Sequence, residues 1–224
     1  MDETPTVLAA FGAGALSIAS AAVAPLLPGF AGYIWNRGLA QLAGFLLGFS
    51  LIFVALGAGA TSVGQALLEQ LTLAERAAGV TLTALGIRDM RAAWSRGPSP
   101  ETGAPERATA STVTAAFVAG AALMFGWTPV AGVVLNRILA IATSADTIEH
   151  GLSLLAVNAA GRALPLAALA LALGATLQRA ATAGSSRDTI QLISGGVVTL
   201  SGLLIVSGLF PSIAAALVPL LPLA

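Results

Sequence analysis

Long runs without charge limit what this sequence can fold into more than any of its other features. Four of them exceed the roughly 20 apolar residues that a helix needs to cross a bilayer. They are Thr4–Asn36, Gly38–Leu68, Ala108–Asn136 and Thr189–Ala224. Apolar residues make up 57% of the chain and charged residues 9%, whereas soluble domains average about 45–50% and about 25%. The sequence therefore predicts an all-α integral membrane protein.

Two further segments span a membrane only if their charges are accommodated. Leu71–Trp94 carries charges near both ends, and it crosses if its arginines reach the interface. Gly151–Gln178 holds Arg162 near its middle, with Asn158 one helical turn earlier on the same face. We expect both side chains to point into the protein or into a wet cavity, where backbone carbonyls or water accept hydrogen bonds from the guanidinium.

The positions of the arginines predict how the chain is oriented, because short loops rich in basic residues stay in the cytoplasm. Only Arg76 and Arg137 lie in loops on one side of the predicted spans. The opposite loops contain Arg37, Arg88, Arg91, Arg96, Arg107, Arg179 and Arg187. Both termini are therefore expected outside the cytoplasm. Residues 1–6 lack the basic region of a cleavable signal peptide, so we expect the first segment to be retained.

Charge and composition also exclude several classes of function. Ten basic and ten acidic residues give no net charge, so no nucleic-acid partner is expected. With no cysteine and one histidine, the chain offers no thiolate metal site and little imidazole, and we expect neither a metal nor a cofactor. It also lacks a phosphate-binding glycine loop and a Ser-His-Asp arrangement, which argues against a kinase or a hydrolase.

A proline-rich stretch divides the sequence into two similar halves. Residues 97–111 are predicted to form a cytoplasmic linker between the halves 1–96 and 112–224. Ala9–Gly14 matches Ala115–Gly120 with a shift of 106, and shorter matches in the second and third segments share a shift of 117. With three spans in each half, the second half enters the membrane from the opposite side. The sequence thus predicts six transmembrane helices in a 3+3 inverted-topology repeat, with chance similarity as the alternative.

The first and fourth helices are predicted to break at proline. Pro25, Pro28 and Gly29 lie well inside the first run, and Pro129 and Gly132 lie inside the fourth. Proline removes an intrahelical hydrogen bond and clashes with the preceding turn. In carriers built from inverted repeats, matched breaks of this kind frame a working site near the bilayer midplane. An ordinary proline kink is the alternative at each site.

The sequence around both breaks resembles the two signature segments of the CcdA family of membrane electron transporters, also found as the membrane domain of DsbD. The first family segment reads Ser-Pro-Cys and then Pro-x-x-Pro-Gly, which Ser20–Phe30 resembles. The second reads Gly-Trp-Thr-Pro-Cys-x-Gly-Pro, which Gly126–Leu135 resembles. The matching residues are Ser20, Pro25, Pro28, Gly29, Gly126, Trp127, Thr128, Pro129 and Gly132.

The departures from the family pattern fall on its chemistry. Ala22 and Val130 stand where the family has its two reactive cysteines, and Ala21 and Val133 stand where it has the adjoining prolines. Thiol–disulfide exchange needs a thiolate and a disulfide, so the chain as written should be redox-inactive. Either the four residues are engineered substitutions, which their clustering at the working positions favours, or a natural relative kept the scaffold and lost the redox function.

The resemblance implies a function in cytochrome c maturation in a bacterial or archaeal inner membrane. In the family, cytoplasmic thioredoxin reduces the disulfide between the two broken helices, and an extracytoplasmic thioredoxin-like protein reoxidises the dithiol after alternating access. These two proteins and the lipid bilayer are the expected partners. The resemblance also implies that helices 1 and 4, rich in small residues such as Gly14 and Gly120, move together against the others.

Two alternatives concern the polar pair in the fifth segment. Beside the hydration of a cavity, Arg162 could favour the thiolate form of a cysteine in a relative that has one. The rival to electron transport is a non-redox solute carrier on the same scaffold, which would move a small neutral or anionic substrate through a cavity near Arg162 and Asn158.

Overall fold

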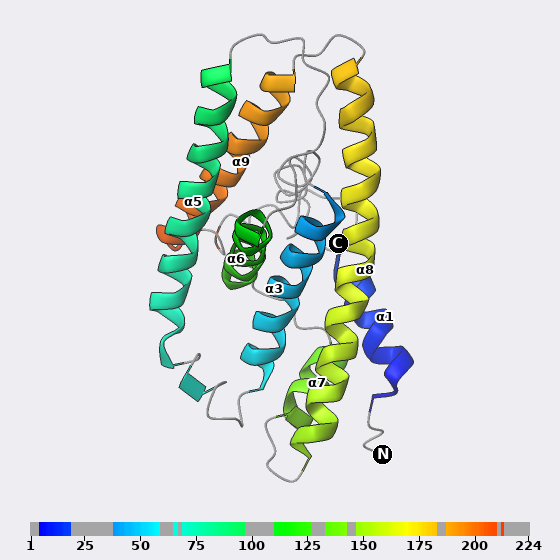
Figure 1. Cartoon of the computed structure of the whole chain (residues 1–224). Coiled ribbons are helices and arrows are strands. Elements are labelled where there is room, and N and C mark those ends of the chain that lie inside the picture. Colours follow the sequence, from blue (N-terminus) through cyan, green and yellow to red (C-terminus); the bar gives the residue numbers. More distant parts are fainter. Residues whose placement is uncertain are drawn as a thin grey trace.

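The computed structural model describes residues 5–18, 38–58, 65–66, 69–96, 110–126, 133–142, 147–182, 187–209 and 212. Its helices are α1 (Val7–Ser17), α3 (Leu39–Gly57), α5 (Leu71–Arg96), α6 (Ala110–Gly126), α7 (Val133–Ala142), α8 (Ile148–Thr182) and α9 (Arg187–Val206). Figure 1 shows them as a bundle, with α3 and α6 in the middle, α5 and α9 on one flank and α8 on the other. No strand occurs in the described ranges, so the all-helical prediction is confirmed.

Three of these helices are long and apolar enough to cross a membrane. They are Leu39–Gly57, Ile148–Leu177 and Asp188–Val206, with mean hydropathies of 2.2, 1.6 and 1.9 over their best windows. The apolar helices Val7–Ser17 and Thr112–Phe125 are shorter than a full span. α5 is a continuous helix of 26 residues with charged residues toward both ends. These helices indicate a membrane location and leave the six-span count a prediction.

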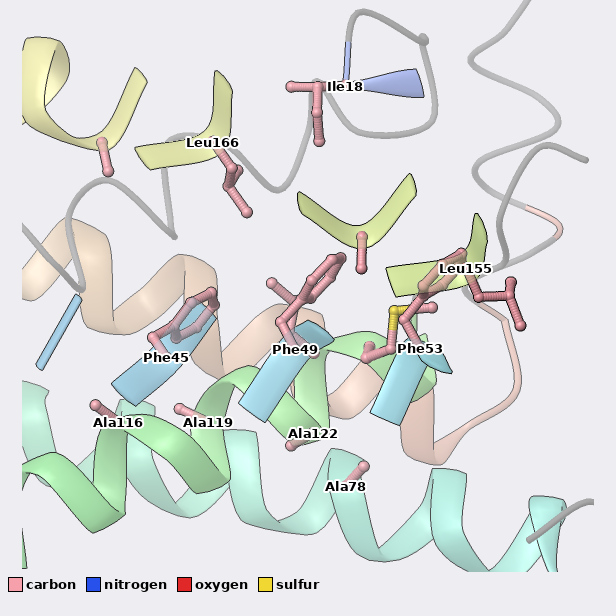
Figure 2. Packing of buried hydrophobic residues seen from close by; sticks show 14 of the residues in the cluster. Ile18, Phe45, Phe49, Phe53, Ala78, Ala116, Ala119, Ala122, Leu155 and Leu166 are labelled. Atoms are coloured by element: carbon pink, nitrogen blue, oxygen red, sulfur yellow. The ribbon is translucent and has the colours of Figure 1, made fainter. Parts of the chain in front are cut away.

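One face of α3 contributes the large aromatic residues of the core. Gln41, Phe45, Phe49 and Phe53 follow one another at intervals of four residues and are all almost completely buried, as expected for one face of an α-helix. In Figure 2 the three aromatic rings project from α3 toward Leu155 and Leu166 of α8. The opposite face exposes large aliphatic side chains such as Leu47 and Leu51, which suits contact with lipid.

Glycines bring helix pairs into backbone contact. Gly48 of α3 lies directly against the carbonyl of Phe117 on α6, and Gly120 of α6 lies against the carbonyl of Phe45. The neighbouring Gly44 packs on Val113, with 2.9 Å between an added Cβ and the carbonyl oxygen. Gly44 and Gly48 form a Gly-x-x-x-Gly pair, and through it α3 makes close contact with α6.

A matching set of contacts joins α1 to α8. Gly14 lies against the carbonyl of Asn158, and Gly161 lies against the carbonyl of Phe11. Neither glycine has room for a Cβ, whereas Gly12 has nothing within 4 Å of the position its Cβ would take. The glycines expected to let helices 1 and 4 slide thus make close contacts with α8 and α3, which is the tight packing typical of small residues in membrane helices.

The third pair, α5 and α9, repeats one motif in antiparallel register. An added Cβ on Gly79 would lie 2.7 Å from the carbonyl oxygen of Gly202, and one on Gly202 would lie 2.6 Å from that of Gly79. One turn after Gly79, the Thr83 hydroxyl donates to its carbonyl at 2.8 Å, and the Thr199 hydroxyl donates to Gly195 at 2.8 Å in the same way. Each of these hydroxyls donates to a carbonyl of its own helix. The contact surface between α5 and α9 therefore consists of small residues whose polar groups are already hydrogen-bonded.

Candidate functional site

The described part of the predicted site lies where α1 and α3 pack against α8. Asn158 and Arg162 are 0% and 1% exposed, as expected for polar residues in the middle of an apolar segment. The Asn158 side-chain amide donates to the carbonyl oxygen of Ala10 on α1 at 2.8 Å. Since Gly14 lets α1 approach the backbone of α8 at this point, the asparagine reaches the next helix directly.

The guanidinium of Arg162 stacks on Phe53 of α3. Its central carbon lies 4.2 Å from the centroid of the ring, a distance at which the ring quadrupole attracts a cation. Sequence reasoning did not find Phe53. The buried face of α3 could have been predicted from its residues at intervals of four, which are Gln41, Phe45, Phe49 and Phe53. That interval does not indicate which helix packs against the face.

Several polar atoms at this site make no hydrogen bond in the part of the chain that the structure describes. Within the described residues, Arg162 Nε and Nη1 and Asn158 Oδ1 are buried and make no hydrogen bond. A buried charge without compensating bonds costs several kcal/mol, so the unmet donors of Arg162 mark this cluster as the candidate site. The ion pair between Arg88 and Asp89, at 3.3 Å, lies on another helix, α5.

The backbone of α8 is also altered next to the pair, by a proline that sequence reasoning missed. Pro165 lies inside the continuous helix and has no N–H, so the carbonyl of Gly161 loses its intrahelical donor. Gly161 itself packs against the carbonyl of Phe11 on α1. The described α1–α8 contact therefore combines a guanidinium with two unbonded nitrogens, an amide and a carbonyl without its usual helical donor, all within two helical turns.

Most of the predicted working positions lie outside the described residues. Of the signature residues, the structure describes Gly126, the last residue of α6, and Val133, the first residue of α7. The others are Ser20, Ala21, Ala22, Pro25, Pro28, Gly29, Trp127, Thr128, Pro129, Val130 and Gly132. The helix breaks at proline and the proximity of Ala22 to Val130 therefore stay predictions.

Three other polar residues, His150, Asn136 and Arg137, are exposed. Among the described residues, no group of three His, Cys, Asp or Glu side chains could hold a metal ion.

Fold and site together define an α-helical membrane protein with a polar cluster buried among three helices. No family model matches the chain. Its sequence is 32% identical to cytochrome c-type biogenesis protein CcdA of Halalkalibacterium halodurans over 97% of each protein. It is 29% identical to a Haemophilus influenzae protein whose name assigns it provisionally to cytochrome c-type biogenesis, over 94% of the chain and 99% of that protein. The chain belongs to the CcdA family.

Proposed function

We propose that this protein is a membrane electron-transporter scaffold of the cytochrome c maturation pathway. The observation that carries the proposal is the similarity to a cytochrome c-type biogenesis protein along nearly the whole chain. In a cysteine-bearing form, the scaffold would take two electrons from cytoplasmic thioredoxin and give them to an extracytoplasmic thioredoxin-like protein. The chain as it stands has no cysteine and does not perform this exchange.

The proposed architecture is six spans in two inverted halves, 1–96 and 112–224, joined by residues 97–111. Matched glycine contacts support it, because Gly14 and Gly120 play the same part in the α1–α8 and α3–α6 pairs. The shift between these two glycines, 14 to 120, equals the predicted 106. Gly48 and Gly161 then correspond with a shift of 113, and Gly79 and Gly195 with a shift of 116.

The last two shifts differ from the register predicted for the later helices. A common shift of 117 paired Gly79 with Gly196, but Gly196 has nothing within 4 Å of an added Cβ, whereas Gly195 packs on α5. The short matches behind that prediction consist of residues common in all membrane helices. Close packing of the backbone sets the register more strictly than residue identity does.

The proposed working site lies between the broken first and fourth helices, at Ala22 and Val130. Small residues at these positions leave room for thiols. In the proposed cycle, the thioredoxin dithiol becomes a disulfide, while its two electrons and two protons convert the disulfide of the scaffold into a dithiol. The orientation follows the arginine count, with both termini outside the cytoplasm of a bacterial or archaeal cell.

Reintroduced cysteines test the proposal. The double variant Ala22→Cys with Val130→Cys should form an intramolecular disulfide under mild oxidation, which reduced thioredoxin opens. The readout is maleimide labelling and gel mobility, with each single-cysteine variant as the matched control. A folded double variant that forms no disulfide would contradict the working site. A solute-carrier function is not favoured, because the names of both relatives concern cytochrome c biogenesis.

A further inference from the structure

We propose that Arg162 holds a small monovalent anion inside the helix bundle. The guanidinium is 1% exposed, and two of its nitrogens make no hydrogen bond within the described residues. Arginine keeps its positive charge in proteins, and a charge at this depth needs a counter-charge. The proposal is independent of cysteine chemistry, so it stands or falls apart from the redox function.

On the described helices packed against α8, no carboxylate lies at this depth. Among the helices packed against α8, neither α1 nor α3 contains an acidic residue, and the one charged residue of α7 is Arg137. On α9, Asp188 lies in the first turn. On α8 itself, Glu149 precedes Arg162 by 13 residues, which corresponds to about 20 Å along a helix. Arg162 therefore forms no direct ion pair with any of these carboxylates.

Phe53 fixes the orientation of the guanidinium without using its donors. The ring contacts the face of the group at 4.2 Å, whereas the N–H bonds of arginine lie in the plane and point outward from its edges. An anion beside the edge can accept from these donors while the ring stays in place. Asn158 Oδ1, one turn away, also makes no hydrogen bond within the described residues; as an acceptor, it does not bind the anion.

The scaffold does not require a cation at this position. With the correspondence of Gly48 to Gly161, Arg162 matches Phe49 and Asn158 matches Phe45 on α3. Both phenylalanines are buried, and the same glycine-to-carbonyl contact forms there. In the equivalent pair α3–α6, apolar side chains at the corresponding positions are therefore compatible with the same close packing. The polar pair on α8 is an addition to the packing, which points to a ligand.

One guanidinium is balanced by one negative charge, so the ligand class is a singly charged, compact anion for which chloride is the probe. The test uses the full chain in detergent at constant ionic strength, with chloride replacing gluconate. The unfolding midpoint should rise with chloride concentration and saturate, because a ligand of the folded state stabilises it by mass action. Sulfate, doubly charged and larger, should give no saturating rise.

Arg162→Met keeps the length of the side chain and should abolish the chloride-specific rise. Arg137→Met, an exposed arginine on α7, is the matched control and should respond as the parent does. A parent protein with the same midpoint in chloride and gluconate would overturn the proposal, as would an Arg162→Met variant that responds like the parent. If Arg162→Met does not fold, the titration of the parent alone decides.

Discussion

Gly86 and Gly195 lie face to face across α5 and α9, each against the carbonyl of the other. An added Cβ on Gly86 would lie 2.7 Å from the carbonyl oxygen of Gly195, and one on Gly195 would lie 2.9 Å from that of Gly86. At such distances a methyl group forces the helices apart. The pair therefore identifies α5–α9 as a contact that tolerates no additional volume.

The first prediction compares two adjacent glycines of α9. Gly195→Ala should lower the free energy of unfolding by about 1–3 kcal/mol, because overpacking of a close contact is destabilising. Gly196→Ala, where nothing lies within 4 Å of the new methyl, should be neutral or stabilising by up to about 1 kcal/mol, since alanine favours the helix. Unfolding in mixed detergent micelles, followed by circular dichroism, measures both. Equal destabilisation by the two variants would contradict the α5–α9 register.

The second prediction concerns the stacked pair. In a double-mutant cycle of Arg162→Met and Phe53→Leu, the coupling free energy should be about 1–2 kcal/mol, the range expected for a cation stacked on a desolvated ring. The parallel cycle of Arg162→Met with Phe49→Leu is the control, because Phe49 is equally buried on the same helix. The same micelle unfolding assay provides the data. A coupling as large with Phe49 would show that α3–α8 packing, and not the stack, carries the effect.

The third prediction concerns the hydrogen bond between α8 and α1. Asn158→Leu removes the hydrogen bond from the side-chain amide to the carbonyl of Ala10 and should cost about 0.5–1.5 kcal/mol, the usual net contribution of one hydrogen bond. Ser153→Ala on the exposed face of α8 is the control, since its hydroxyl bonds within the same helix. We expect the exposed substitution to change stability by less than about 0.5 kcal/mol. If the two substitutions changed the free energy of unfolding equally, the hydrogen bond between Asn158 and Ala10 would not contribute to stability.

The fourth prediction concerns orientation, for which the absence of cysteine gives a clean background. In intact cells, Thr6→Cys should react with a membrane-impermeant maleimide, and Ser99→Cys in the linker should react only after the cells are opened. The reason is the arginine-rich set of loops on the side of the linker. Reversed accessibility of the two positions would overturn the predicted topology without affecting the family assignment.

The sequence alone predicted where several helices lie, because a long run without charge can be recognised from neighbouring residues. The predicted segment Leu71–Trp94 coincides with α5, which ends at Arg96, and Gly151–Gln178 lies within α8. The burial of Arg162 followed in the same way from its position within an apolar run. The partner Phe53 and the register of the third helices depended on which faces meet, and that is decided by close packing between segments distant in the chain.

Each of the three glycine-lined pairs joins a helix encoded before the linker to one encoded after it. During synthesis, α1, α3 and α5 therefore emerge without the helices that complete them. At about 5–20 residues per second, the second half follows over on the order of ten seconds. Throughout that interval the small-residue faces of the nascent chain meet only lipid or the insertion machinery. The bundle can therefore close only after the second half has been translated.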